Sequence, residues 1–359
     1  IAVDRLGFVH VVWRQLYDDG SWEIIYSRST DNGIQWTGFA GGADKVISHR
    51  NVVSGDLKIL EPPKIALSNA GGAEILHVVW TEYDQQNGMQ EVFYSRSVDH
   101  GESWSGTTAD MMISSASTIE PARSPSIAVS GPSGEHVCVA WTQRFQGDNQ
   151  DEIWVARSHN FGGDSWIPEQ PVTKLVTDGL DAGSPSIAGS QFGFAVVWPQ
   201  KFQTSLPAEL LYGFSLDFGD TWSCDGRDWR ISFPDGQPVQ NPSIAISPLG
   251  RAYAAWVEQD QNAYSSNEIH ASWTDDITVP NSWSGLYRDE IISIPDASDS
   301  SEPADAGNVS VAYAFVDGAW RSHAVWDEIN WTSYAASSPG GSQTNSISSP
   351  EWEIIIDGA

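Results

Sequence analysis

Three short stretches of this 359-residue chain combine residue types that catalyse reactions in many enzymes. The sequences SRSTDNGIQW, SRSVDHGESW and GFSLDFGDTW all fit the pattern Ser-x-Asp-x-Gly-x-x-Trp, at residues 27–36, 95–104 and 213–222. A hydroxyl beside a carboxylate suits proton transfer or nucleophilic attack. A catalytic cluster is normally needed once, whereas a structural turn recurs as often as the fold repeats. The recurrence therefore favours a structural role for Asp31, Asp99 and Asp217.

Two weaker copies extend the series. RSHNFGGDSW at 157–166 has Asn160 in place of the aspartate and one additional residue, and SWTDDITVPNSW at 272–283 is longer still. In such a turn the Asp side chain can accept backbone hydrogen bonds, the Gly can adopt a positive φ, and the Trp ring can be buried. The structural residues that we expect in these turns are Asp31, Gly33, Trp36, Asp99, Gly101, Trp104, Asn160, Trp166, Asp217, Gly219 and Trp222.

The turns belong to larger repeats, which must position any functional side chain. Six apolar stretches end in tryptophan, with spacings of 67, 61, 57, 58 and 70 residues, at Trp13, Trp80, Trp141, Trp198, Trp256 and Trp326. Another apolar stretch, such as SPSIAVS or NPSIAIS, precedes most of them, and a third, such as EIIYSRS, leads into the turn. Period-two alternation, Gly and Pro punctuation and the lack of a helical period all indicate strands.

Four strands in each of six units predict an all-β fold, a six-bladed β-propeller with four antiparallel strands per blade. We expect a single domain, with blades at approximately residues 1–60, 61–122, 123–182, 183–239, 240–306 and 307–359. The final stretch WEIIIDGA should be the last strand of the sixth blade. We expect the ring to close by contact between whole blades, without a strand borrowed from the other terminus.

A second set of polar residues recurs two positions after each strand-ending tryptophan. All six are amides or acids: Gln15, Glu82, Gln143, Gln200, Glu258 and Glu328. The loops that come after the second strand of each blade lie on one face around the central channel, so these side chains should form a ring near that face. The ring either binds a polar ligand or consists of strand ends that make the same local hydrogen bond, and both interpretations stay open.

The repeated turn resembles the Asp-box, or BNR repeat, of sialidases and other secreted propellers. The resemblance covers nearly the whole chain. It implies that the turns join the third and fourth strands at the periphery, away from the ligand face. Sialidases use three arginines around a carboxylate, an Asp acid/base, and a Tyr nucleophile assisted by Glu.

Part of that set has a counterpart in the third unit. Sialidases carry one arginine in an Arg-Ile-Pro motif, and the chain has ARSPSIAVS, which places Arg123 two residues before a proline. Downstream, TQRFQGDNQDEIW is similar to the stretch after that motif in sialidases and contains Arg144, Asp148 and Asp151. A guanidinium fork suits a carboxylate because its paired donors match the two oxygens. No motif selects the other arginines or the Tyr–Glu pair, so the catalytic residues stay unassigned, and a solvated surface role for Arg123 and Arg144 is the alternative.

Composition restricts the partners. With 47 acidic and 18 basic residues the net charge is -29, which should repel nucleic acid and anionic membranes. No apolar run is long enough to span a membrane. The acidic, lysine-poor surface suits an extracellular or cell-surface setting, or it only maintains solubility. The two cysteines, Cys138 and Cys224, should be free thiols, and the eight His show no ligand spacing, so we expect no metal site and no cofactor. Ca²⁺ is the ion that so acidic a chain could hold, although no EF-hand-like loop is present.

Three functions fit these observations. The preferred one is a non-catalytic extracellular propeller that binds a glycan or a surface protein, because the turns are intact while the catalytic set is incomplete. The alternative is a sialidase-type glycoside hydrolase that acts on extracellular glycans, favoured by Arg123 and the polar ring. The third is a purely structural repeat that self-assembles into a surface layer or filament.

Overall fold

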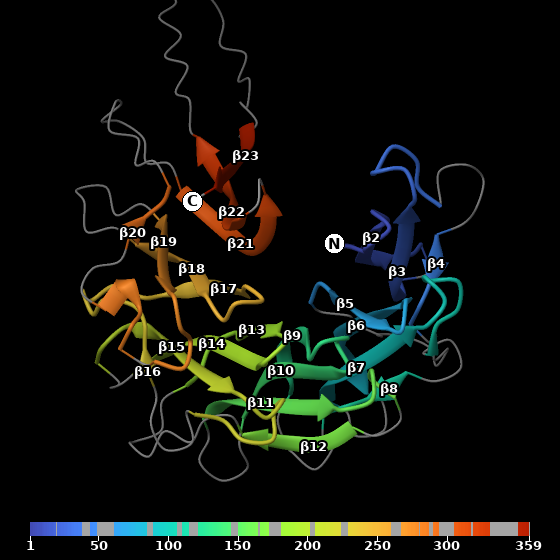
Figure 1. The fold of residues 1–359 in the computed structure, drawn as a ribbon, viewed down its shortest axis with the longest axis horizontal. Coiled ribbons are helices and arrows are strands. Elements are labelled where there is room, and N and C mark those ends of the chain that lie inside the picture. Colours follow the sequence, from blue (N-terminus) through green and yellow to red (C-terminus); the bar gives the residue numbers. More distant parts are fainter. Residues whose placement is uncertain are drawn as a thin grey trace, which may run out of the picture.

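The chain folds into antiparallel sheets arranged around a common centre, as Figure 1 shows. The computed structural model describes residues 1–18, 20–37, 44–48, 61–84, 89–105, 110–114, 121–144, 150–163, 166–171, 181–201, 205–223, 229–259, 267–279, 281–286, 290–293, 305–316, 319–330 and 351–358. Apart from a short 3-10 helix, η2 (Ser284–Leu286), the regular elements of these residues are all strands. The molecule is therefore nearly all β.

Each sheet is a blade built from consecutive strands. Blade 1 contains β1 (Ala2–Val3), β2 (Val9–Leu16), β3 (Trp22–Ser29) and β4 (Lys45–Val46); blade 2 contains β5 (Lys64–Ala70), β6 (Ala73–Asp84), β7 (Met89–Ser97) and β8 (Met111–Met112). Blade 3 contains β9 (Arg123–Ser130), β10 (His136–Arg144), β11 (Asp151–Ser158) and β12 (Trp166–Pro171). Blade 4 contains β13 (Ser186–Ser190), β14 (Gly193–Lys201), β15 (Ala208–Ser215) and β16 (Trp229–Arg230).

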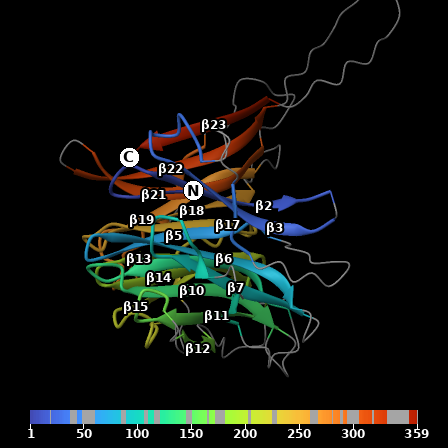
Figure 2. The ribbon, with the colours of Figure 1, turned by 90° about the vertical axis from the view of Figure 1, so that its right-hand side faces the viewer.

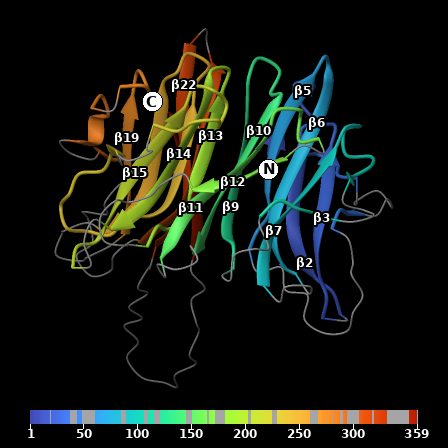
Figure 3. The ribbon, with the colours of Figure 1, turned by 90° about the horizontal axis from the view of Figure 1, so that it is seen from below.

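The last two blades differ in size. Blade 5 has four strands, β17 (Gln240–Ile246), β18 (Ala252–Gln259), β19 (Asn267–Thr274) and β20 (Glu290–Ile291). Blade 6 has three in the described residues, β21 (Asp305–Val316), β22 (Ala319–Asn330) and β23 (Glu351–Gly358), where the sequence predicted four. Residues 352–358 of WEIIIDGA thus lie in the third strand of this blade, and no N-terminal strand joins the described sheet. No hydrophobic cluster of the described residues joins blade 6 to blade 1, whose strands stand apart in Figure 1, so the expected contact that closes the ring is not seen. Figures 2 and 3 show the strands of successive blades running side by side.

The core lies between neighbouring blades, because alternate residues of each strand point to opposite faces of its sheet. One cluster joins Val12, Ile24 and Tyr26 of blade 1 to Val78 and Trp80 of blade 2. Equivalent clusters join each later pair of blades. The repeated tryptophans lie three or more residues before the ends of their strands. Four of them are fully enclosed, with 0% exposure, at Trp80, Trp141, Trp198 and Trp256. Trp13 of blade 1 is only half-buried.

Serine hydroxyls join the inner strands around the channel. Ser126 Oγ accepts a hydrogen bond from the backbone N–H of Ile187 at 3.2 Å, so blade 3 is tied to blade 4. The same bond recurs from blade 4 to blade 5 and from blade 5 to blade 6, at Ser186 and Ser243. The serine of the repeated SPS and NPS stretches therefore satisfies a backbone donor of the next blade.

Candidate functional site

The Ser-x-Asp turns (residues 29–36, 97–104 and 215–222) share one hydrogen-bond pattern. In the second turn, Ser97 Oγ donates to Asp99 Oδ1 at 2.7 Å, and the Asp99 carboxylate accepts the backbone N–H of Ser103 at 2.8 Å. Gly101 has a φ of 85° and donates its N–H to Ser97 Oγ. The first and third turns repeat these bonds at Asp31 and Asp217. The polar groups of the cluster are thus used within the turn.

The burial of the tryptophan differs between the turns, and the copy of the turn in blade 3 departs from the hydrogen-bond pattern. The Trp104 and Trp222 rings are buried, and each turn's Gly keeps a positive φ, whereas Trp36 is half-buried. In the third blade, the backbone N–H of Asn160 bonds to Ser158 Oγ, and Trp166 opens the six-residue strand β12. Hydrogen bonds from the Gln35 N–H and the Ser29 hydroxyl hold the pKa of Asp31 below its usual value.

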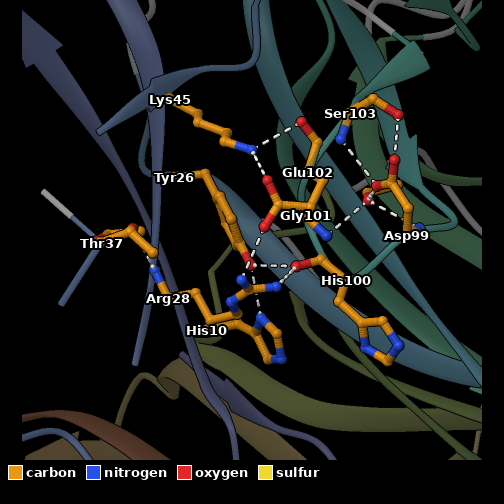
Figure 4. A network of polar contacts seen from close by, with 12 residues as sticks. His10, Tyr26, Arg28, Thr37, Lys45, Asp99, His100, Gly101, Glu102 and Ser103 are labelled. Carbon is orange, nitrogen blue, oxygen red and sulfur yellow. Dashed lines mark hydrogen bonds and ion pairs between the residues drawn. The ribbon is translucent and has the colours of Figure 1, made fainter. Parts of the chain in front are cut away.

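Arginines of one blade hold the turn of the next. Arg28 of blade 1 donates to the His100 carbonyl and to Glu102 Oε1 of the second turn, as Figure 4 shows. Arg96 of blade 2 likewise donates to the Phe161 carbonyl, and Arg157 of blade 3 donates to Asp220 Oδ1 at 2.8 Å. These turns therefore lie at the junctions between blades and contact the preceding sheet.

Two aromatic–histidine pairs lie behind the turns. Tyr26 Oη is 2.8 Å from His10 Nδ1, and Tyr94 Oη is 2.8 Å from His77 Nδ1 (the first pair appears in Figure 4). Burial lowers the pKa of His77 to about 3 and raises that of Tyr94 far above its usual value. Both groups stay neutral at physiological pH, so the pairs suit packing better than proton transfer.

The amides and acids two residues after the repeated tryptophans make the same local hydrogen bond in each blade where their side chains are described. In blade 2, for example, Trp80 Nε1 donates to Glu82 Oε2 at 3.0 Å. The side chain of Glu328 lies outside the described residues. The four other acceptors of an indole N–H from the tryptophan two residues earlier are Gln15, Gln143, Gln200 and Glu258.

The structure brings together three of the four residues that the sequence singled out in the third blade. Asp151 Oδ2 is 2.5 Å from Arg123 Nη2, and Asp151 Oδ1 is 3.4 Å from Arg144 Nε. Asp148 lies outside the described residues. The two guanidinium groups are partly exposed, with 41% and 31% of their side chains accessible. Two guanidinium groups thus share the Asp151 carboxylate, and Asp181 Oδ1 accepts the backbone N–H of Asp151 at 3.1 Å.

Beside this cluster, the starts of the inner strands enclose a hollow of about 450 Å³ at the channel mouth. Its polar lining is mainly hydroxyl and amide groups, from Ser124, Ser126, Ser184, Ser186, Asn241, Ser243, Asn308 and Ser310. Three of these, Ser124, Asn241 and Asn308, have a positive φ between 43° and 53°. Asn and Ser can hold this conformation better than bulky residues, and it turns the backbone at the lip of the channel.

Two charged side chains complete the hollow. Glu61 accepts the backbone N–H of Ser124, and its Oε1 lies 3.3 Å from Ser124 Oγ, so this carboxylate is bound by the protein itself. Lys64 is exposed, and no ion pair involving it occurs among the described residues. The hollow therefore offers hydroxyls, amides and one available ammonium group.

The sequence interpretation did not assign these channel-lining residues. The SPS and NPS repeats indicate strand starts in the sequence, but no local pattern places their side chains at the channel mouth. A signal was present in the second unit, where PPK puts Lys64 at the position of the serine in the other repeats. The lysine in place of the repeated serine distinguishes blade 2 from the blades that carry the serine.

No group of three or more His, Cys, Asp or Glu with the geometry of a metal site occurs in the described part of the chain. The same part contains no helix long and apolar enough to cross a membrane. Cys138 is a buried free thiol in β10, and Cys224 lies outside the described residues.

Solved structures share this fold at low sequence identity. An α-L-arabinofuranosidase of Fusarium graminearum, in complex with an iminosugar inhibitor, superposes with a TM-score of 0.52 at 12% identity over 90% of this chain and 86% of that one. An α-L-arabinanase of Penicillium chrysogenum, complexed with arabinobiose, gives 0.51 at 11% identity over 74% and 76%. The sialidase of Trypanosoma rangeli gives 0.52 at 13% identity over 91% of this chain and 50% of its own. No family model and no curated protein matches the chain. The protein has a sialidase-like β-propeller fold, shared with glycoside hydrolases.

Proposed function

We propose that this chain is a non-catalytic, extracellular or cell-surface propeller that binds a glycan over the channel mouth. The observation that carries the proposal is the hollow of about 450 Å³ lined by hydroxyl and amide side chains and by Lys64. Sugars present many hydroxyl groups, and small polar side chains with one charged donor match them by hydrogen bonding.

The charges of the hollow support binding rather than hydrolysis. Most retaining and inverting glycosidases use two carboxyl groups flanking the bond to be cut, whereas sialidases combine a carboxylic acid with a Tyr nucleophile. No Tyr is among the described residues that line the hollow. Among the described residues that line the hollow, Glu61 is the carboxylate, and it is held by Ser124. A single carboxylate engaged by the protein supplies neither a free acid nor a free nucleophile.

The repeated turns fit this proposal as structural Asp-boxes. Their hydrogen-bonding groups are used within the turn, and the arginines of the preceding blade hold their outer surface. We infer that the turns stabilise the junctions between blades and leave the opposite, channel-mouth face for the ligand.

The test is a glycan array with the purified chain, followed by calorimetric titration of the best glycan. Lys64→Ala should weaken binding by about tenfold, the loss expected for one hydrogen bond from a charged donor. Lys201→Ala is the matched control, because Lys201 is an exposed lysine that does not line the hollow. No binding on the array, or equal losses in the two variants, would contradict the proposal.

A glycoside hydrolase is the second candidate, and one observation favours it. Arg123 and Arg144 converge on Asp151 next to the channel mouth, where two guanidinium groups could take the carboxylate of a sugar acid. The proposal of a binding protein predicts no enzymatic turnover of a fluorogenic sialoside or arabinofuranoside. Turnover that Arg123→Ala abolishes at an unchanged melting temperature would establish the hydrolase instead.

A further inference from the structure

A second hollow lies at the junction between blades 5 and 6, on the side of the molecule that carries the turns. It encloses about 490 Å³ and is lined by four aromatic side chains, Tyr253, Trp273, Tyr313 and Trp320. Trp273 is the most exposed of the tryptophans whose side chains the structure describes, at 42%. The channel-mouth hollow has no residue in common with this one.

The hollow exists because blade 5 departs from the repeat. Trp273 pairs with Tyr253 across the strands, just as Arg28 pairs with His10 in blade 1. At that position blades 1 to 3 carry the arginines that hold the next turn, and blade 5 carries an indole ring. The Trp273 ring is 42% exposed and lines the hollow at this junction.

Polar groups stand at the edge of the aromatic surface. Arg251 Nε is 3.1 Å from Asp275 Oδ1, and both side chains are more than half exposed, at 53% and 86%. Glu290 also lines the hollow. Burial raises the pKa of Tyr313 to about 12, so its hydroxyl keeps its proton and can donate a hydrogen bond. The rim thus offers donors and acceptors beside apolar ring faces.

The charges select among ligands that have both an apolar face and hydroxyl groups. Two carboxylates and one guanidinium give the rim a net negative charge, within a chain of net charge -29. An anionic sugar or an acidic peptide would be repelled. A neutral sugar ring fits, because its C–H face can pack on an indole while its hydroxyls bond to Arg251, Asp275 and Glu290.

The geometry points to a second carbohydrate-binding site at the junction between blades 5 and 6, in which Trp273 packs against a ring of a neutral oligosaccharide. This site is separate from the channel mouth and does not depend on the function proposed there. With both sites occupied, one molecule would hold two glycan chains on opposite faces.

Calorimetric titration of the full chain with cellohexaose, xylohexaose and arabinohexaose tests the site. Binding of at least one of these is expected, with Trp273→Ala and Trp273→Arg each weakening it by at least about tenfold, the loss typical of an aromatic anchor. Trp273→Arg installs the residue that blades 1 to 3 carry, which guards against a loss caused by unfolding. The matched control is Leu249→Ala, because Leu249 is 66% exposed and does not line this hollow.

The variants also separate the two sites. Lys64→Ala should leave this binding unchanged, and Trp273→Arg should leave binding at the channel mouth unchanged. Failure of all three oligosaccharides to bind would overturn the inference, as would binding that survives both substitutions of Trp273. Failure of all three sugars to bind leaves the channel-mouth proposal to its own glycan-array test, whereas binding that survives both Trp273 substitutions but is weakened by Lys64→Ala would place the sugar at the channel mouth.

Discussion

Replacing Gly101 by alanine tests whether the turns join neighbouring blades. An added Cβ would lie 2.2 Å from Tyr26 Oη of the preceding blade. Gly33 provides a control within the same chain, because its φ of 86° matches the 85° of Gly101 while the nearest heavy atom to its Cβ is 3.9 Å away, in Trp36. The two substitutions therefore share the backbone strain and differ in the contact between blades.

The magnitudes depend on these two contributions. A left-handed conformation costs a non-glycine residue about 1 to 2 kcal/mol, and both variants bear this cost. Overpacking adds about 1 to 3 kcal/mol. Tyr26 is only 2% exposed and is hydrogen bonded to His10, so it has little room to move. Gly33→Ala should thus lose about 1 to 2 kcal/mol of unfolding free energy, and Gly101→Ala about 2 to 5 kcal/mol.

Urea denaturation of both variants measures the difference directly. A double-mutant cycle with Tyr26→Ala should then reduce the cost of Gly101→Ala to that of Gly33→Ala, because the clashing ring is gone. Equal losses in the two single variants would refute the argument that Gly101 is required by the preceding blade.

Three further outcomes are expected. Asp99→Ala should lower unfolding free energy by about 1 kcal/mol and leave glycan binding intact, since its half-exposed carboxylate bonds only within its turn. The melting temperature should fall more steeply below about pH 4 in the wild type than in Asp31→Asn. The pKa of Asp31 is lower in the folded than in the unfolded protein, so its ionised carboxylate stabilises the fold at pH values above the unfolded-state pKa. This stability is lost as the pH falls through the folded-state pKa. In a Cys224→Ser variant, iodoacetamide at pH 8 should label Cys138 only after unfolding, because burial raises the pKa of this thiol to about 12. Labelling of the native protein would contradict this expectation. Melting curves of wild type and Asp31→Asn that coincide at every pH would contradict the previous one.

The repeat made most of the architecture predictable. The repeated tryptophans mark the second strand of each blade. An Asp with a Gly two residues later marks the turn, because few other residues satisfy those backbone positions. The short fourth strands at Lys45–Val46, Met111–Met112 and Trp229–Arg230 fall in three similar stretches, KVIS, MMIS and WRIS, which recur after the turns. In blade 6 the described residues contain three of the four predicted strands, and residues 331–350, between its second and third strands, lie outside the described part.

The site was less accessible from sequence. Arg123, Arg144 and Asp151 were selected by resemblance, and they do lie together. The hollows could not be predicted from the sequence, because each is formed by residues of more than one blade. No local sequence pattern indicates which residues of different blades face one another. The sequence shows that Lys64 replaces the repeated serine and that Trp273 replaces the repeated arginine. Only the arrangement of the blades shows that each of these residues lines a hollow.

Among the described residues, the arginines that hold the turns occur only in blades 1 to 3, so the junctions between blades in the N-terminal half should depend more on ionic strength than those in the C-terminal half. Charged side chains span the junctions of blades 1 to 4, where Arg28 meets Glu102 and Arg157 meets Asp220. Both carboxylates are exposed, at 61% and 52%, so dissolved ions can screen these pairs. In blade 4 the equivalent position carries Phe214, which packs against the cluster between blades 4 and 5, and salt does not screen such packing. Added salt should therefore loosen the N-terminal junctions first, and amide hydrogen exchange would locate that change blade by blade.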